Sequence, residues 1–258
     1  MKCPTDAMTA LRCNQILDAA AVLVEQQGIV SFKFSQLAKE VGCSTGTLYR
    51  FFQGKEDILV CLFLRHATSN YLAAFVRRHP ELTAQQRLLL PVIFTFETIR
   101  RSKVFFTLRS VSVNKLVWQL ASEEKVGKFK RRINAFWSWF HRSIDLAIAS
   151  GELSAGDRER SELTQSLVFF LTGVLTQFES ELIPVEFLGE RRETCYRHLA
   201  LLMSRYGWQQ PLTQARYTEL EAQVARFFDA EVKSQGNCDS CAALDSQLQQ
   251  DCCSFKAH

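Results

Sequence analysis

Hydrophobic residues recur at intervals of three and four along most of the chain, which is the spacing of one face of an α-helix. The alternation typical of strands is nearly absent, so the sequence predicts an all-α protein with about ten helices and no internal repeat. The first boundaries are the clearest. One helix ends at Gly28, a short helix over 34–41 ends at Gly42, and Ser44 caps a second short helix that continues through Phe52.

Longer helices are predicted in the rest of the chain, where start and stop signals lie further apart. Thr83, Ser102 and Ser122 are expected N-caps, because a hydroxyl oxygen can accept from the first free backbone amides of a helix. Pro91 is expected to kink the helix that Thr83 begins, and Gly207 to end a helix over 187–206. The predicted helices begin near residues 55, 83, 102, 122, 163, 187 and 211, and the last fades near residue 236.

The two short helices between residues 34 and 52 have the spacing of a helix-turn-helix. That motif needs a small residue where the helices cross and a left-handed residue at the corner, and Ala38 and Gly42 supply them. Leu37 and Leu48 supply the apolar faces. By itself the pattern fits any corner between two helices as well as a DNA-binding motif.

The run from Ile16 to Leu59 resembles the DNA-binding domain of TetR/AcrR-family transcriptional regulators. Gly28, the Ala38–Gly42 pair, the run GTLYRFF at 46–52 and the lysine after it carry the resemblance. It implies an N-terminal three-helix helix-turn-helix DNA-binding domain over 1–55, followed by a larger helical effector-binding and dimerisation domain over 56–235. Residues 236–258 are expected to form a flexible, Cys-rich tail.

The resemblance implies that the second short helix enters the major groove of DNA. Arg50 can then bond a guanine edge, and Thr45 and Thr47 can bond a base or contact a thymine methyl. Tyr49 and Lys55 match positions that contact phosphates, although Tyr49 can also pack between helices and Lys55 can be a solvated residue at a helix start. The expected DNA-binding residues are Lys33, Ser44, Thr45, Gly46, Thr47, Tyr49, Arg50 and Lys55.

Two positions depart from the family pattern. Lys33 stands where the family commonly has serine or threonine; lysine can neutralise a phosphate but cannot cap a helix, which leaves Ser31 or Ser35 for that role. Phe51 stands where a histidine or tyrosine is frequent, which removes one polar contact. Residues 33–55 nevertheless hold four basic side chains against one acidic, so the local charge favours a polyanion.

Charge is distributed unevenly along the 258 residues, although the net charge is only +4. Residues 77–142 hold fourteen Lys and Arg against four Glu and are rich in aromatic side chains, whereas residues 143–258 hold ten against seventeen acidic residues. The resemblance places a ligand pocket in the basic region, and pockets are mostly apolar with few polar anchors. The hypothesis is a small amphipathic or aromatic effector with an anionic group, such as an acyl thioester or acid. The alternative is a solvated basic face over an ordinary core. The candidate ligand-binding residues are Arg100, Arg101, Lys103, Phe105, Arg109, Trp118 and Trp137.

Four of the nine cysteines lie in the last twenty-one residues, with a terminal histidine: Cys238, Cys241, Cys252, Cys253 and His258. Such thiols can share zinc or a soft copper ion, or sense oxidants through a disulfide, but Cys252 and Cys253 are neighbours whose side chains diverge. The third interpretation is a polar tail with free thiols. No metal ligand and no cofactor is therefore assigned. The other five cysteines lie in or beside helical stripes and are expected to fill the core.

The remaining features exclude several classes. No secretory signal and no run of about 18 apolar residues is found, which predicts a cytoplasmic protein without a membrane partner. No catalytic motif is present, so the protein is not expected to be an enzyme. The expected partners are double-stranded operator DNA, a second copy of the chain through residues 163–182 and 187–206, and a small-molecule effector. The predicted function is a ligand-responsive repressor, with a metal- or thiol-redox-responsive regulator as the alternative.

Overall fold

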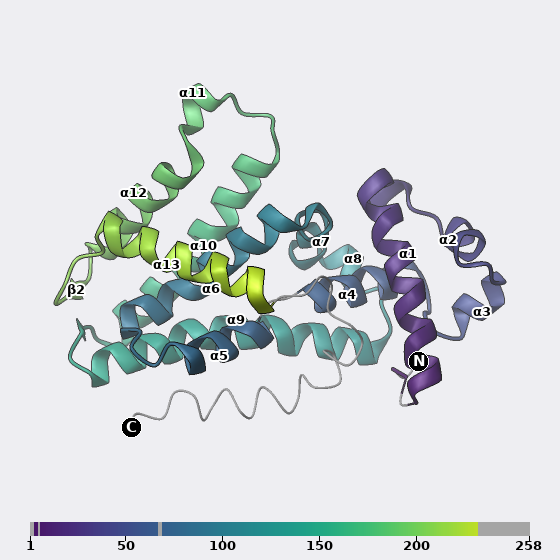
Figure 1. The fold of residues 1–258 in the computed structure, drawn as a ribbon, viewed down its shortest axis with the longest axis horizontal. Helices are drawn as coiled ribbons and strands as arrows, with labels where there is room; N and C mark the ends of the chain where they lie inside the picture. Colours follow the sequence, from purple (N-terminus) through teal and green to yellow (C-terminus); the bar gives the residue numbers. More distant parts are fainter. Residues whose placement is uncertain (1–2, 5, 67–68, 232–258) are drawn as a thin grey trace. The chain divides into compact units, whose positions relative to one another are not determined.

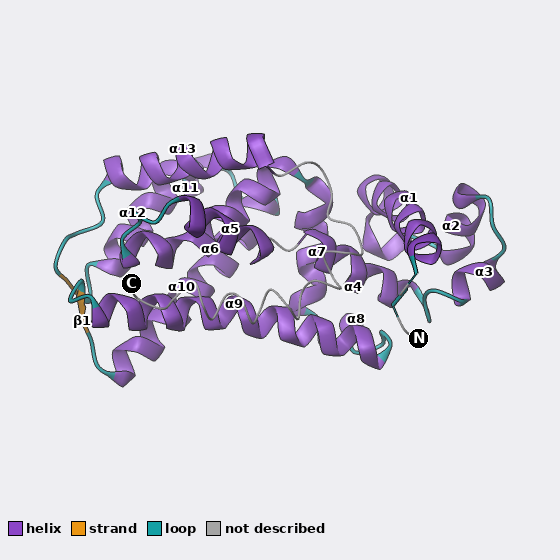
Figure 2. Cartoon of the chain, turned by 60° about the horizontal axis from the view of Figure 1, so that its bottom comes forward, coloured by secondary structure: helices purple, strands orange, loops and turns teal. Residues whose placement is uncertain are grey.

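The computed structural model describes residues 3–4, 6–66 and 69–231. Within them the chain forms thirteen helices and one short antiparallel ribbon, which confirms the all-α class (Figure 1). The ribbon pairs Leu153 of β1 (Leu153–Ser154) with Trp208 of β2 (Gly207–Trp208), and Figure 2 shows how little of the chain it occupies. The helices are α1 (Ala7–Ser31), α2 (Phe34–Val41), α3 (Thr45–Tyr49), α4 (Lys55–His66), α5 (Ser69–Arg78), α6 (Ala84–Arg101), α7 (Lys103–Val113), α8 (Lys115–Trp118), α9 (Glu123–Ala149), α10 (Asp157–Glu179), α11 (Val185–Leu188), α12 (Arg191–Met203) and α13 (Gln214–Glu231).

The described residues pack into two compact units. The first unit takes its described residues from 1–70 and 98–134, and the second from 71–97 and 135–233. In the first, α4, α7 and α8 pack with one another, and α1 contacts α2, α4 and α7. This unit extends beyond the predicted 1–55 domain, whose functional boundary stays a prediction. The predicted tail, 236–258, lies outside the described residues.

Burial of apolar stripes builds the core of the first unit. Ile16 and Leu17 of α1 are fully buried, as the helical spacing predicted. The Phe63 ring of α4 lies 5.8 Å from that of Phe105 and 5.1 Å, edge to face, from that of Phe129. Aromatic pairs in such tilted arrangements are favourable beyond the area they bury. The cluster ties α4, α7 and α9 together.

The second unit has an equivalent aromatic core of its own. The Phe75 ring of α5 lies edge to face at 5.4 Å from Phe94 of α6 and at 5.3 Å from Phe227 of α13. Buried Trp139 of α9 donates its indole hydrogen to the carbonyl of Arg87 at 2.9 Å, so its polar atom is satisfied. The apolar stripe of α10 that begins at Leu163 is also buried inside the chain.

Several helix ends match the sequence predictions. Gly28 (φ 73°) interrupts α1, and Gly42 (φ 66°, ψ 43°) ends α2 in the left-handed conformation that other residues rarely adopt. Thr83 Oγ1 accepts from the Gln86 amide at 3.2 Å, and Ser102 accepts from the Phe105 amide at 3.2 Å, so both caps are confirmed.

Other predicted helix ends were wrong. Helix α3 ends at Tyr49 rather than Phe52, because the next residues form turns. The single helix expected over 187–206 is broken at Gly189 (φ 71°), and Gly207 lies in β2 instead of capping it. Ser122 precedes α9 as expected, but its buried Oγ has no hydrogen-bond partner in the part of the chain that the structure describes. These ends depend on tertiary contacts that a local pattern does not contain.

Two helical stretches, Ala7–Ser31 and Lys55–Arg78, are long and apolar enough to cross a membrane by length and composition alone. The second includes residues 67 and 68, which are not described. Core helices and signal sequences pass the same test, and 79% of the most apolar window in the second stretch is buried in the fold. These two stretches are therefore weak support for a membrane span.

Candidate DNA-binding interface

The corner between α2 and α3 is built as the sequence predicted. Leu37 and Ala38 are buried where the helices meet, and the Cys43 amide donates to the Ala38 carbonyl at 2.9 Å after the left-handed residue. Ser44 then begins α3: its Oγ accepts from the Thr47 amide at 3.0 Å and lies 3.0 Å from the Thr47 hydroxyl. The cap satisfies one of the free amides at the start of a helix too short to be stable alone.

The exposed face of α3 is polar and its buried face is held by one residue. Leu48 is 0% exposed. The side chains of Thr45 and Arg50 are exposed, and that of Thr47 is half-buried. Ser44 and Gly46 are also exposed, so most of the predicted recognition positions face solvent on one short helix.

The positions expected to contact phosphates flank this helix. Tyr49 is 53% exposed, and its ring also packs at 4.9 Å on that of Phe34, so both interpretations of this residue describe part of its environment. Lys33 is exposed at the N-cap position of α2 and makes no side-chain cap, as expected for lysine. Lys55 is half-buried at the first residue of α4.

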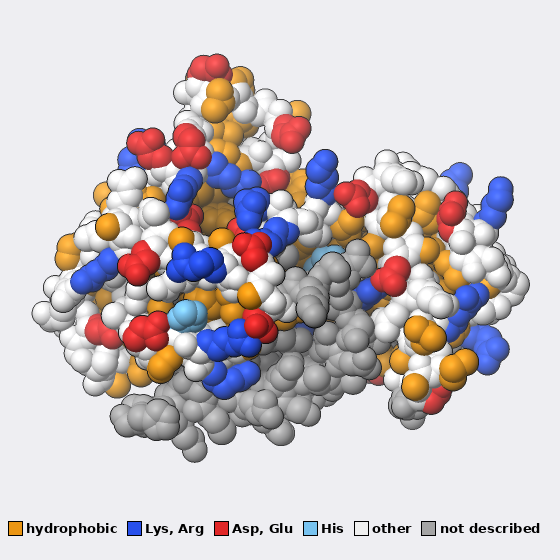
Figure 3. All heavy atoms as spheres, in the orientation of Figure 1, with side chains coloured by type: hydrophobic (Ala, Val, Ile, Leu, Met, Phe, Trp, Pro, Cys, Tyr) orange, Lys and Arg blue, Asp and Glu red, His pale blue; other side chains and the backbone are white. Residues whose placement is uncertain are grey.

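Basic side chains are exposed on the part of the first unit that carries α2 and α3, as Figure 3 shows. Lys33, Lys39 and Arg50 are the exposed cations of this segment, and Glu40 is its acidic residue. A concave or flat surface with excess positive charge attracts the phosphates of DNA irrespective of sequence. The charge and the exposed hydroxyl and guanidinium groups together have the chemistry of a nucleic-acid interface.

Sequence reasoning missed one group of residues beside this surface. Asp57 of α4 accepts from the Gln53 amide at 2.7 Å and from the Ser122 amide at 2.6 Å, and it forms an ion pair with Lys125 at 3.0 Å. An acidic residue in the first turn of α4 was visible in the sequence. Its partner, 68 positions away, was not.

The candidate ligand-binding residues do not meet in one place among the described contacts. Arg100, Arg101 and Lys103 are exposed and Arg109 is half-buried. Phe105 is buried against Phe63, Trp118 lies 6.1 Å from the Phe129 ring, and Trp137 lies 6.5 Å from the Phe169 ring. The first six belong to the first unit and Trp137 to the second. Their common role stays a prediction.

A half-open hollow of about 250 Å³ in the second unit is lined by a different set of residues, most of them with polar side chains. Glu152 borders it and accepts from the amides of Ala84 and Gln85 at the start of α6, at 2.9 and 3.1 Å. Both oxygens of the Glu152 carboxylate therefore accept from backbone amides at the start of α6. None of the seven candidate ligand-binding residues lines this hollow.

The structure describes five of the cysteines, and none of these five forms a disulfide. Cys13, Cys61 and Cys195 are buried, as expected for small core residues, whereas Cys3 and Cys43 are half-buried. The five tail residues considered above for metal binding lie outside the described residues. Across the ranges that are described, no group of three or more His, Cys, Asp and Glu side chains could hold a metal ion.

Comparisons with known proteins agree with this geometry. The model of the family "Bacterial regulatory proteins, tetR family" matches residues 16–61. The chain is 28% identical over 151 residues to the fatty acid metabolism regulator protein of Bacillus subtilis (strain 168), covering 55% of this chain and 71% of that protein.

Two solved structures share the fold at low sequence identity. A bacterial regulatory protein in the tetR family from Rhodococcus RHA1 has a TM-score of 0.55 and 16% identity, covering 77% of this chain and 98% of that one. The TetR family transcriptional regulator PfmR from Thermus thermophilus has a TM-score of 0.54 and 17% identity, covering 73% and 97%. The helix-turn-helix segment over 16–61 thus belongs to the tetR family of bacterial regulatory proteins, and together with the larger helical region after it the chain has the fold of a tetR-family regulator.

Proposed function

We propose that the chain is a homodimeric transcriptional repressor that a small molecule releases from operator DNA in the cytoplasm. The observation that carries the proposal is the arrangement of α3. Leu48 is buried and anchors this helix to the fold, so the polar face of the helix is exposed to solvent. The relatives compared above are regulators rather than enzymes, in keeping with the absence of catalytic motifs from the sequence.

The proposed DNA contacts divide by chemistry. Arg50 and the threonines of α3 read base edges in the major groove, while Tyr49, Lys33 and Lys55 bind phosphates and fix the position of the helix. Two copies place their recognition helices in successive major grooves, roughly 34 Å apart, so the operator is pseudo-palindromic.

The dimer is proposed to form through α10 and α12. These helices pack on each other within the chain. Phe169 of α10 and Leu201 of α12 are both 64% exposed, and exposed Gly173 leaves room for the close approach of another helix. A symmetric pair of such faces makes a four-helix interface.

The effector is proposed to be amphipathic and anionic, with an acyl thioester as the preferred class. Two facts support this class. The Bacillus relative is named as a fatty acid metabolism regulator, and residues 77–142 carry a large excess of Lys and Arg among aromatic side chains. The effector acts by binding better to a conformation in which the two recognition helices are mis-spaced for DNA, which shifts the population away from the bound form.

Selection of genomic DNA fragments by the purified protein tests the DNA-binding proposal. The expected result is enrichment of a pseudo-palindromic site. On that site, Lys55→Ala should reduce the slope of log K against log salt by about one unit per half-site. Lys115→Ala, which changes an exposed lysine of α8, is the matched control and should leave the slope unchanged. Selection without enrichment contradicts the DNA-binding proposal, and an unchanged Lys55→Ala slope removes the phosphate assignment.

Thermal unfolding with defined lipophiles tests the effector class. Palmitoyl-coenzyme A and palmitate are the anionic probes, and dodecyltrimethylammonium is the cationic one, each below its micelle concentration. The anionic probes should raise the unfolding temperature and weaken operator binding. Stabilisation by the cation alone contradicts the proposed class.

A further inference from the structure

A buried ion pair joins α4 to the first turn of α9 in the first unit. Lys125 Nζ lies 3.0 Å from Asp57 Oδ2, and the two side chains are 3% and 0% exposed. Charged residues are rarely buried this completely, because removing each charge from water is costly unless its hydrogen bonds are replaced. The groups that replace these hydrogen bonds therefore identify the segments that the pair connects.

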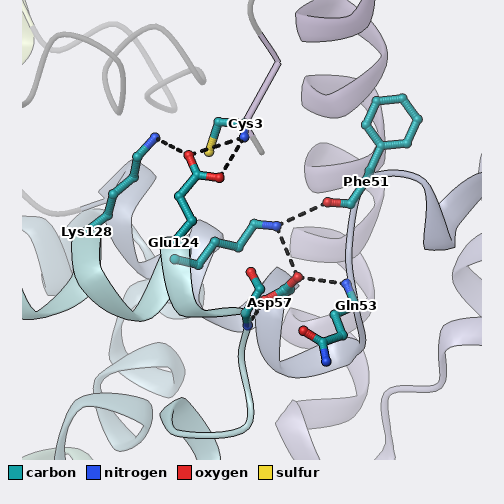
Figure 4. Close-up of polar contacts among 8 residues, drawn as sticks. Cys3, Phe51, Gln53, Asp57, Glu124 and Lys128 are labelled. Atoms are coloured by element: carbon teal, nitrogen blue, oxygen red, sulfur yellow. Dashed lines mark hydrogen bonds and ion pairs between the residues drawn. The ribbon is translucent and has the colours of Figure 1, made fainter. Parts of the chain in front are cut away.

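Both partners also bind the backbone of the turn that follows the recognition helix. Lys125 Nζ donates to the Phe51 carbonyl at 3.1 Å. The Gln53 amide donates to Asp57 Oδ2 at 2.7 Å, as Figure 4 shows. Phe51 and Gln53 lie two and four residues after the last residue of α3. The Lys125 ammonium also lies 5.0 Å from the centre of the Phe52 ring. The Asp57–Lys125 pair thus binds this turn at two backbone groups, the Phe51 carbonyl and the Gln53 amide.

The same carboxylate binds the start of α9. Its other oxygen, Asp57 Oδ1, accepts from the Ser122 amide at 2.6 Å, immediately before Glu123 begins the helix. One buried group therefore connects the end of the recognition helix, α4 and α9. We refer to Asp57, Lys125 and the backbone groups of Phe51, Gln53 and Ser122 as the α9 clamp.

Both members of the pair are charged at neutral pH. Burial alone would raise the pKa of Asp57, but the Gln53 and Ser122 amides and Lys125 outweigh it, so this pKa lies below its usual value. Burial alone would lower the pKa of Lys125, but nearby Cys61 and Asp57 raise it above its usual value. Hydrogen bonds to a charged group are stronger than neutral ones, so the clamp constrains its backbone partners tightly.

Neighbouring ion pairs of the same unit are arranged differently. Arg65 of α4 binds Asp18 of α1 at 2.6 Å, but the Asp18 side chain is half exposed. Lys128, one turn beyond Lys125, pairs with Glu124 of its own helix at 3.4 Å. The Lys125–Asp57 pair is distinguished by complete burial and by its bonds to the backbone beside the recognition helix.

We propose that Asp57 and Lys125 are positioning residues for DNA recognition, which set the orientation of α3 according to the place of the first turn of α9. The inference rests on the proposed DNA-binding function and deepens it. A shift of the first turn of α9 moves Ser122 and Lys125, and with them the backbone at Phe51 and Gln53. Coupling of this kind travels through hydrogen-bonded groups that link rigid elements.

Four variants test the clamp. Lys125→Met keeps most of the apolar stem and removes the bond to the Phe51 carbonyl, and Asp57→Asn removes the negative charge. The double variant removes both charges and so leaves no buried charge without its partner, which keeps the test interpretable if either single variant unfolds. Lys128→Met is the matched control, because it makes the same change one turn along the same helix.

Two measurements are made on the full chain: operator affinity, and hydrogen exchange of the backbone amides over 47–54. Lys125→Met and the double variant should weaken operator binding by about 3- to 30-fold. In both variants the backbone amides over 47–54 should also exchange faster. The unfolding temperature of the double variant should stay near that of the unchanged protein. Lys128→Met should match the unchanged protein in both measurements.

Each contrary outcome has one meaning. A folded double variant that binds operator and exchanges like the unchanged protein overturns the clamp as a positioning device. A double variant that does not fold also overturns it, because the pair is then a requirement of the fold. If the unchanged protein and Lys128→Met both bind no selected DNA, the proposed function fails, and this result is separate because hydrogen exchange still reports on the turn.

Discussion

The helix-turn-helix segment, residues 34–54, and the α10–α12 pair differ in how far they bury their apolar side chains. In the first, Leu37, Leu48 and Phe52 are buried, and the exposed positions of α3 are mostly polar. In the second, the stripe from Leu163 is buried, yet Phe169 and Leu201 remain largely exposed. The surface of the helix-turn-helix segment therefore suits a hydrated polyanion. The exposed apolar side chains of α10 and α12 suit a further apolar partner.

The difference extends to how each region is held in place. The five-residue helix α3 has little intrinsic stability and depends on the Ser44 cap, on Leu48 and on the α9 clamp. Helices α10 and α12, at 23 and 13 residues, are long enough to bury a stripe within the chain and still present a second face. The short helix α3 is thus oriented by its neighbours, whereas the long helices α10 and α12 have enough surface for a second contact.

Leu48→Ala should give the largest effect. Truncating a fully buried leucine typically costs about 2–5 kcal/mol of unfolding free energy, and here it removes the only wholly buried side chain of α3 in the structure described. Chemical denaturation measures the loss. Leu116→Ala is the control, because this leucine of α8 is 70% exposed, lies outside the proposed dimer face and should change unfolding free energy by much less. Equal losses would contradict the assignment of Leu48 as the buried anchor of the helix-turn-helix.

Leu201→Glu tests the exposed face directly. If this face meets its symmetric copy, each dimer loses two buried leucines and gains two charges, which should weaken association by about 100-fold or more. Light scattering across micromolar concentrations measures the change in mass. An unchanged protein that is monomeric under these conditions refutes the dimer, and a dimeric Leu201→Glu variant places the interface elsewhere.

Ser44→Ala should have a smaller effect confined to the helix-turn-helix. Loss of an N-cap hydroxyl costs about 1 kcal/mol and frees the Thr47 amide. Hydrogen exchange over 44–50 should increase while that of α10 and α12 stays constant. Ser35→Ala, an exposed serine within α2, is the control. A change of equal size in α10 would show that the two regions do not respond separately.

The smallest expected effect is a pH dependence of the first unit. Burial lowers the pKa of His66, whose Nδ1 lies 2.9 Å from the Leu62 carbonyl and whose ring stacks on Phe105. A histidine with a lowered folded-state pKa stabilises the fold above its unfolded pKa of about 6.5, and this contribution is lost as the pH falls below that value.

Acidification from pH 7.5 to 5.5 should therefore lower the hydrogen-exchange protection factors of α4 and α7, which compare the observed rate with the intrinsic amide rate at each pH. His66→Phe retains a ring that can stack on Phe105 but does not titrate, so its protection factors should depend less on pH. Protection factors of α4 and α7 that fall equally in both proteins would assign the effect to other groups.

The sequence predicted the parts of the candidate site that local rules decide. Gly42 is left-handed because the corner needs a positive φ, and Ser44 caps α3 because its hydroxyl lies beside free amides. Ser122 shows the limit of such rules. Its residue type and the glutamates after it predicted a cap, but the Asp57 carboxylate binds its amide instead and its hydroxyl has no partner among the described residues.

By itself the sequence determined the helical class, the helix-turn-helix and its family, since these follow from periodicity, turn residues and a contiguous motif. Only the tertiary structure decided that α4 and α7 pack against α1, that Phe169 and Leu201 stay exposed, and that Asp57 pairs with Lys125. The physical reason is range: a cap or turn depends on atoms a few residues apart, whereas burial and ion pairing depend on which distant segments meet.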